Sequence, residues 1–564
     1  MGKYIHLFGT ETAFNSTYKG EGYEEPWVSY ILENERIKYN KTDYEKSLEV
    51  PMSFKITGDG DIVWRASSTA NTKTIEYKKN DGDWTEITSS TGGTSLSVVS
   101  GDTVQFRGNN QAYGDTYTGY TSFSGTTATF EVEGNIMSLM SPADFCNLDS
   151  FSSMFAFPSL FMQCTGLTDA SKLVLPATTL DAYCYRAMFS GCTNLMTTPE
   201  LPATTLASSC YELMFAGCTS LTTAPELPAT TLSTYCYANM FGGCTSLTTA
   251  PTLPATTLAN NCYQEMFKNC TSLTTTPVLP ATTMVYFCYN RMFNGCTGLT
   301  STPILPAMTL GQSCYGYMFA DCTSLTTPPA LPATTLANSC YSEMFQNCTS
   351  LTQAPVLPAA TLTEYCYKDM FYNCQSLTTA PELPATTLAS HCYDWMFYNC
   401  LNITTPPALP ATTLADSCYK GMFHNCRKLS QVPNLPATAL TTSCYQNMFN
   451  GCSQLTSVPE NYLPLTTLTS SCYAGMFWYC VNLESGPSLP APILTPSCYQ
   501  DMFRSCGKLS AITCLATDIS ATNCTKNWVN QVATSGTFTK AAGMSSWASG
   551  VDGIPSNWTI QNAS

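Results

Sequence analysis

One repeating pattern of apolar and polar positions dominates the chain. Its fixed residues are Cys-Tyr-x-x-Met-Phe-x-x-Cys, in thirteen copies that run from Cys184 to the copy beginning at Cys498. Eleven of the twelve intervals between leading cysteines are 26 residues long, and one, from Cys444 to Cys472, is 28. A strict period of this length is typical of a solenoid, in which each coil buries its apolar face against the next.

Within a coil, the spacing of apolar residues predicts a helix. Between residues 206 and 218, apolar residues fall at 206, 210, 211, 214, 215 and 218, which indicates an amphipathic helix of about three turns. The residue before the second cysteine is Gly, Asn or Asp in eleven copies, so we expect a left-handed residue there that ends the helix. Tyr479 and Ser505 break this rule. Residues 220–231 are rich in Thr and Leu and bounded by prolines, which predicts short extended segments.

The flanking sequences have a different character. Residues 48–135 contain seven short runs of alternating residues separated by turn signals, which predicts an all-β Ig-like sandwich with a hairpin near residue 80. Residues 1–47 are rich in aromatics but too short for a core of their own, so we expect a docking or anchoring segment or a simple cap. The solenoid is assigned to residues 136–510, and residues 511–564 are expected to cap it.

Composition narrows the class of protein. Hydrophobic residues make up 44% of the chain and charged residues 11%, which favours a packed core over disorder. A net charge of −15 disfavours nucleic acid and anionic membrane as partners. No apolar run is long enough for a membrane span, and the first residues lack the apolar core of a secretory signal. We therefore expect synthesis in a cytoplasm without a signal peptide.

The 30 cysteines leave two interpretations open. Twenty-six of them occupy the two fixed positions of the repeat, either as small buried hydrophobes in the reduced form or as a ladder of disulfides. The missing secretion signal favours the reduced form. A zinc site is disfavoured because the paired cysteines stand eight residues apart and the chain has three histidines. We predict no metal and no cofactor.

The sequence offers little for catalysis. His6, His391 and His424 are the only histidines, and we expect the latter two at variable, exposed positions of the predicted helices. No phosphate-binding loop, nucleophile elbow or zinc-protease motif is present. Paired threonines in each coil suit exposed strands better than a ligand array. We predict no catalytic residue.

Ligand recognition is expected where the repeats differ. Large aromatic residues replace small polar ones at a few variable positions, and such residues favour binding hot spots and stack on flat ligand surfaces, including glycan rings. Local packing against the next coil is the alternative. The candidates are Tyr286, Phe287, Trp395, Tyr398, Trp478 and Tyr479.

The repeats resemble a known family. A spaced Leu and Leu-Pro followed by Met-Phe-x-x-Cys-x-x-Leu is similar to the BspA-like leucine-rich repeats, over roughly residues 150–510. The chain departs from that pattern in its second proline and added cysteine per coil. Similar repeats occur in surface proteins of gut Bacteroidales and in phages that infect them. Residues 4–8, 25–30, 134–139 and 553–559 resemble modules from the same setting.

This resemblance implies adhesion and protein–protein contact, with no catalytic residues to transfer. We expect an α/β solenoid of leucine-rich-repeat type, with about 13–14 coils, preceded by the Ig-like sandwich. The leading hypothesis is a non-enzymatic structural and adhesion protein of a phage virion, in a tail or head fibre or appendage. Residues 1–47 would contact other virion proteins, and the solenoid would bind a host cell-surface protein or glycan. The alternatives are a bacterial surface or exported adhesin and a glycan-active enzyme; the oligomeric state is left open.

Overall fold

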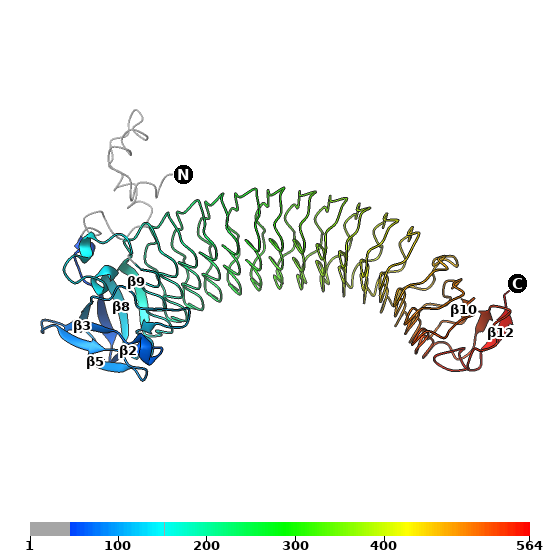
Figure 1. Ribbon diagram of the computed structural model, residues 1–564, viewed down its shortest axis with the longest axis horizontal. Helices are drawn as coiled ribbons and strands as arrows, with labels where there is room; N and C mark the ends of the chain where they lie inside the picture. The colour runs from blue at the N-terminus through cyan, green and yellow to red at the C-terminus, as the bar shows by residue number, and fades with distance from the viewer. Residues whose placement is uncertain (1–45, 152, 564) are drawn as a thin grey trace, which may run out of the picture.

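The computed structural model describes residues 46–151 and 153–563, so the expected anchoring role of residues 1–47 falls almost entirely outside it. The chain forms a two-sheet unit at one end, an arched stack of coils, and a three-stranded unit at the other end (Figure 1). Among the described residues, no helix combines the length and apolar character needed to cross a membrane.

The N-terminal unit is built from the strands that the alternation predicted. Each of the seven predicted runs coincides with a strand, and β3 and β4 form the predicted antiparallel hairpin, with Asn80 at φ 52° in its turn. The two-residue strand β7 was not predicted. The larger sheet has the order β4-β3-β6-β1-β8-β9 and the smaller one β5-β2-β7. The elements are β1 (Ser53–Gly58), β2 (Gly60–Ala66), η1 (Thr69–Asn71), β3 (Thr74–Lys79), β4 (Thr85–Thr88), β5 (Thr94–Val98), β6 (Thr103–Arg107), β7 (Thr121–Ser122), β8 (Thr129–Asn135), η2 (Ile136–Leu139), η3 (Phe145–Asn147) and β9 (Leu167–Val174).

The larger sheet continues into the first coil. Strand β9 belongs to that coil, yet it pairs in parallel with β8 of the N-terminal unit. The cores are also continuous, because the Phe123 ring stacks on Phe161 with 5.8 Å between centroids and the Tyr113 ring stacks on Phe157 at 5.6 Å. The two-sheet unit therefore covers the open N-terminal face of the stack.

The helix predicted in each coil is wrong, and with it the α part of the predicted α/β solenoid. Residues 206–218 form consecutive turns, and no α-helix occurs among the described coils. Ser209 (φ 54°), Leu213 (φ 60°) and Gly217 (φ 75°) all have left-handed backbone. One left-handed residue in every four interrupts a right-handed helix. The apolar spacing of four therefore reflects a four-residue turn unit and not a helical face.

The left-handed residue before the second cysteine is confirmed. It is present even in the two coils that lack the expected residue types, where Tyr479 has φ 59° and Ser505 has φ 60°. The conformation is thus imposed by the stack as well as permitted by the residue, since non-glycine side chains adopt it only at a cost.

Backbone amides along the turns alternate between two kinds of partner. The N–H of Tyr211 donates to the carbonyl of Cys236 in the next coil at 3.0 Å, and the N–H of Phe215 donates to Met240 at 2.9 Å. Between them, the N–H of Met214 donates within its own coil to the carbonyl of Tyr211 at 3.2 Å. The alternation satisfies the buried backbone and joins each coil to the next.

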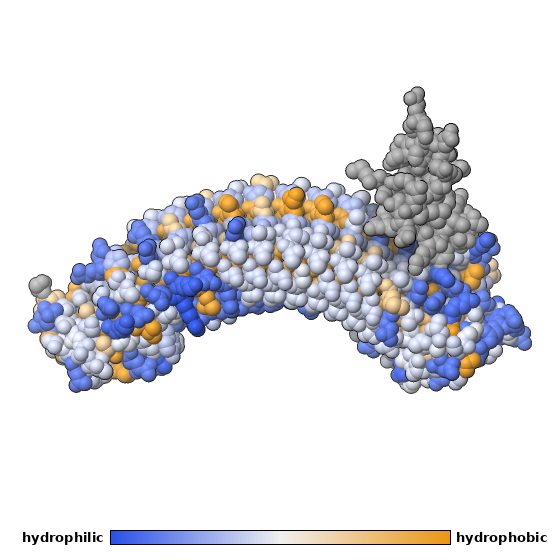
Figure 2. Space-filling view, turned by 180° about the vertical axis from the view of Figure 1, so that it is seen from behind, coloured by the Kyte–Doolittle hydropathy of each residue, from blue (hydrophilic) through white to orange (hydrophobic). Residues whose placement is uncertain are grey.

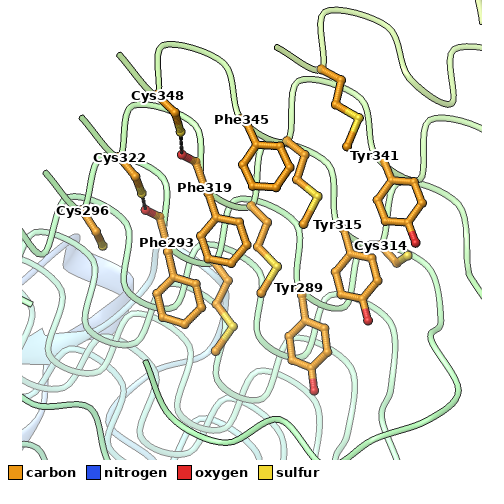
Figure 3. Packing of buried hydrophobic residues seen from close by; sticks show 14 of the residues in the cluster. Tyr289, Phe293, Cys296, Cys314, Tyr315, Phe319, Cys322, Tyr341, Phe345 and Cys348 are labelled. Atoms are coloured by element: carbon orange, nitrogen blue, oxygen red, sulfur yellow. Dashed lines mark hydrogen bonds between the residues drawn. The ribbon is translucent and has the colours of Figure 1, made fainter. Parts of the chain in front are cut away.

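The fixed side chains form continuous columns inside the stack (Figure 3). Neighbouring tyrosines stack with ring centroids 5.7–6.3 Å apart, and neighbouring phenylalanines 5.3–5.9 Å apart. The second cysteine of each coil donates its thiol to a phenylalanine carbonyl of the preceding coil, as Cys322 does to Phe293 at 3.1 Å. All 30 cysteines are free thiols, and all except Cys146 are buried.

The Thr-rich segments contact one another more sparsely. Successive coils meet there through single parallel bridges, such as Thr223 with Thr249, because prolines on either side cannot extend a ladder.

Hydrophobic side chains also form a row along the outer edge of the central coils (Figure 2). Val278, Ile304 and Val356, each just before a Leu-Pro pair, are 77–81% exposed.

A ladder of side-chain amides runs along the left-handed corner of the later coils. The Asn373 amide donates to Asn347 Oδ1 at 2.9 Å and accepts from Asn399 at 2.5 Å. The ladder continues from Asn347 to Asp321 at 2.8 Å and from Asn425 to Asn399 at 2.5 Å. These residues both tolerate the left-handed backbone and bond adjacent coils.

Residues 511–563 cover the C-terminal end of the stack. The strands β10 (Ala511–Cys514), β11 (Thr537–Lys540) and β12 (Thr559–Asn562) form a parallel sheet. The buried Trp528 ring lies 6.3 Å from Tyr499 and 6.4 Å from Phe503, so one side chain ends both aromatic columns. Its indole N–H donates to the Gly553 carbonyl at 2.8 Å.

We predict that the protein loses stability steeply above pH 9. Burial raises the pKa of the Cys444 and Cys498 thiols to about 11 and that of Cys288 to about 12, from an ordinary value of 9.0. The unfolded chain releases these protons first, so stability is full below pH 9 and falls as the pH rises toward the folded pKa values. Each thiol contributes up to about 1.4 kcal/mol per pH unit. The urea midpoint, followed by circular dichroism from pH 7 to 10.5, should fall; a constant midpoint would contradict the buried-thiol core.

We also predict that the amide ladder and the left-handed backbone contribute separately. Asn373→Ala should destabilise its coil by about 2 kcal/mol, because it adds backbone strain and removes the ladder bonds. Asn373→Gly should cost about half as much, since glycine relieves the strain. Hydrogen exchange over residues 366–400 measures the local free energy of opening, with Asn338→Ala as an exposed control. Equal effects of Ala and Gly would show that the backbone conformation carries no cost.

Candidate ligand-binding groove

Three columns of variable residues line the outer face of the turns. We define the first column as the residue before each leading cysteine, and the second and third columns as the residues two and three positions after it. In two successive coils the first and second columns carry only small residues. These residues are Ser313, Gly316, Ser339 and Ser342.

A groove of about 460 Å³ opens where these small residues follow one another. Its volume lies in the range of small-molecule sites. The four small residues form part of its lining, and larger residues of the flanking coils contribute the rest. The lining comprises Gln264, Phe287, Asn290, Arg291, Ser313, Gly316, Tyr317, Ser339, Ser342, Glu343, Tyr365 and Lys368.

Of the four first-column residues that line the groove, the two outermost are aromatic. Phe287 lies at one end, packed on Tyr286 with 4.3 Å between ring centroids. Tyr365 lies at the other end, and His391 of the following coil stacks on it at 4.9 Å. Both aromatic side chains are therefore supported from outside the groove.

A linked set of polar residues from the third column lines the groove. The Arg291 guanidinium lies 4.4 Å from the centre of the Tyr317 ring. Burial, followed by a hydrogen bond with Glu343, raises the pKa of Tyr317 to about 12. Burial also raises the pKa of Glu343, while its hydrogen bond with Tyr317 opposes the rise. Glu343 is the one carboxylate among the lining residues.

The cations of the groove have carboxylate partners outside it. Arg291 lies 3.6 Å from Glu265, and Lys368 lies 2.9 Å from Asp369. These pairs leave the groove close to electrically neutral. Within the described residues, no group of three or more His, Cys, Asp or Glu side chains is placed to hold a metal ion.

The structure distributes the six aromatic candidates over three places. Tyr286 and Phe287 lie at the groove, as described. Trp395 and Tyr398 belong to a separate cluster further along the stack, with 5.5 Å between their rings. Trp478 and Tyr479 lie near the C-terminal end, where Arg504 covers the Trp478 ring at 4.9 Å. The candidates therefore do not form one site.

Packing explains much of the Trp395 cluster. Trp395 and Tyr398 both contact His424, at 5.0 and 4.9 Å between rings, and Tyr398 also stacks on Tyr372 at 4.3 Å.

The expectation that the histidines lie at exposed helix positions is wrong. His424 is half-buried on a turn, and burial lowers its pKa to about 4. His391 is also half-buried, with Nδ1 2.8 Å from Asp394 Oδ2.

Comparison with known proteins identifies the repeat. A family model described as the BspA type leucine rich repeat region, in six copies, matches residues 158–300, 263–404 and 338–484. These matches span more than half of the chain. The chain belongs to the BspA-type leucine-rich repeat family. The predicted resemblance is therefore confirmed, and the family is a repeat family and not a catalytic one.

Solved structures give more distant likenesses. A leucine-rich cell surface protein from Faecalibacterium prausnitzii A2-165 is 16% identical, with 63% of this chain and 74% of that chain covered and a TM-score of 0.25. TLR13 in its complex with ssRNA13 is 14% identical, with 62% and 44% covered and a TM-score of 0.22. At these scores neither likeness bears on function. No curated protein matches the chain.

We predict that Tyr317→Phe raises the pKa of Glu343 further. The substitution removes the phenol that bonds to the carboxylate, and burial then acts with less opposition. A carbon-13 NMR titration of the Glu343 carboxyl measures the shift. Tyr235→Phe, in the first column of a distant coil, is the control and should leave Glu343 unchanged. A Glu343 pKa that is the same in the wild type and the Tyr317→Phe variant would exclude the hydrogen bond.

Proposed function

We propose that this BspA-type repeat protein is a non-enzymatic adhesion protein whose solenoid presents the groove to a cell surface. The observation that carries the proposal is a nearly neutral groove that opens where small residues follow one another in two successive coils. The stack holds the lining residues at fixed spacing, which limits the entropy lost on binding. Glycoside hydrolysis generally uses two carboxylates. Glu343 is the one carboxylate that lines the groove, which supports ligand binding over hydrolysis by a glycan-active enzyme.

We further propose a place for this protein in a phage particle, as part of a tail or head fibre or appendage. This rests on the resemblance of the repeats, the N-terminal segment and the tail to modules found in gut Bacteroidales surface proteins and in the phages that infect them. Residues 1–47 would attach to other virion proteins, and the two-sheet unit, as an Ig-like sandwich, would act as a spacer. A bacterial surface or exported adhesin is the alternative, with the same groove facing outward.

The expected result is that mass spectrometry finds the protein in purified virions at a stoichiometry fixed relative to the capsid protein. Virions purified on two successive density gradients provide the sample, and a non-structural phage protein provides the negative control. Its absence from virions, together with its presence on bacterial cells, would favour the alternative. Adhesion itself is tested by saturable binding of the labelled full chain to host cells.

A further inference from the structure

We infer that the groove binds a short, neutral stretch of a linear surface oligosaccharide, laid along the stack with sugar rings against Phe287 and Tyr365. This inference rests on the proposed adhesive function and names the ligand class of its site. It follows from the length of the groove, from its lining and from the state of the backbone beneath it.

The groove suits a chain more than a single small ring. Phe287 and Tyr365 are three coils apart, and the rings of Tyr365 and His391, which are neighbours in the same column, are 4.9 Å apart. At that spacing the two aromatic ends are about 15 Å apart. A ligand that contacts both must be extended along the stack.

The lining has the mixed chemistry that sugars require. Aromatic faces pack against the apolar faces of sugar rings, and hydroxyl and amide groups bond to sugar hydroxyls. Phe287 and Tyr365 supply the aromatic faces. The hydroxyl and amide groups come from side chains between and beside these aromatics, namely Gln264, Asn290, Ser313, Ser339 and Ser342.

Charge in the groove favours a neutral ligand. Each lining cation already has a carboxylate partner, Glu265 for Arg291 and Asp369 for Lys368. A strongly anionic ligand would have to compete with those partners, and the chain as a whole carries a net charge of −15. Nucleic acid and polyanionic glycans are thus disfavoured.

The backbone beneath the groove disfavours an extended peptide. Peptides often bind by adding a strand to free backbone groups. Here the N–H of Ser313 donates to Asn338 at 3.0 Å, and the N–H of Ser339 donates to Glu364 at 2.9 Å. The Ser313 carbonyl accepts from the backbone N–H of Gly316 and from the Asn290 amide. Recognition must therefore come from side chains.

The repeat supplies a matched pair of variants for the test. Ser339→Tyr should fill the groove, and the fold accepts tyrosine in this column because Tyr183 and Tyr235 already occupy it in other coils. Ser443→Tyr places the same side chain in the same column, outside the groove. Phe287→Ala and Tyr365→Ala remove the aromatic ends. Thermal unfolding of each variant verifies that the stack is intact.

Binding of the full chain is measured on an array of neutral and acidic bacterial surface oligosaccharides, with affinities from calorimetry. We expect neutral linear oligosaccharides to bind, Ser339→Tyr to abolish binding, and Ser443→Tyr to leave it unchanged. Each alanine variant should weaken binding about tenfold or more. No binder on the array, or equal binding by the Ser339→Tyr and Ser443→Tyr variants, would overturn the inference.

Host cells separate this inference from the function on which it rests. Periodate treatment of the cells should remove binding of the wild-type chain, and protease treatment should leave it. Binding that survives periodate but not protease would identify a protein receptor, which overturns the oligosaccharide inference while the adhesive function stands. If the wild-type chain binds no host cells but does bind the array, the adhesive function fails and the groove assignment remains.

Discussion

The architecture depends on the alternation of backbone hydrogen bonds along the turns. Every second amide bonds within its own coil, and the amides between them bond to the next coil. The chain can keep this alternation only by placing a left-handed residue at every fourth position. Residues such as Leu213, which rarely adopt that conformation, do so here because the cross-coil bonds and the buried columns outweigh the strain.

The core follows from that constraint. Backbone hydrogen bonds hold successive coils together, so identical side chains lie above one another. Flat aromatic rings stack better in such a column than branched aliphatic side chains do. The small second cysteine fits beside the phenylalanine column, and its thiol donates a hydrogen bond to a carbonyl that already accepts one from the backbone. The Phe293 carbonyl, for example, accepts from the backbone N–H of Cys296 and from the thiol of Cys322. The core is thus apolar in composition yet contains a regular set of weak polar contacts.

Much of this could be predicted from sequence, and the failures have physical reasons. The period, the strands of the N-terminal unit, the left-handed residue and the family were all predicted correctly from local patterns. The helix was wrong because a spacing of four satisfies both a helical face and a four-residue turn unit. A strict spacing, without the drift that 3.6 residues per turn would require, was the available signal.

The candidate site was only partly accessible to the same reasoning. Phe287 stood out because it is large where its neighbours are small. The groove itself is formed by residues that are small, and Ser313 or Gly316 gives no local sign that the two coils share a gap. Tyr365 carried the same signal as Phe287, but its place in the groove depends on coils three repeats apart sharing one surface, which no local pattern reveals.

The interval of 28 residues shows how such a stack tolerates change. The two extra residues form a local excursion around Tyr462, while the aromatic columns pass from Tyr445 to Tyr473 at 6.0 Å as if no insertion had occurred. Gain or loss of whole units by recombination between near-identical gene segments would leave the same columns in register. The length of the stack could then change in coil-sized increments while the groove stays intact.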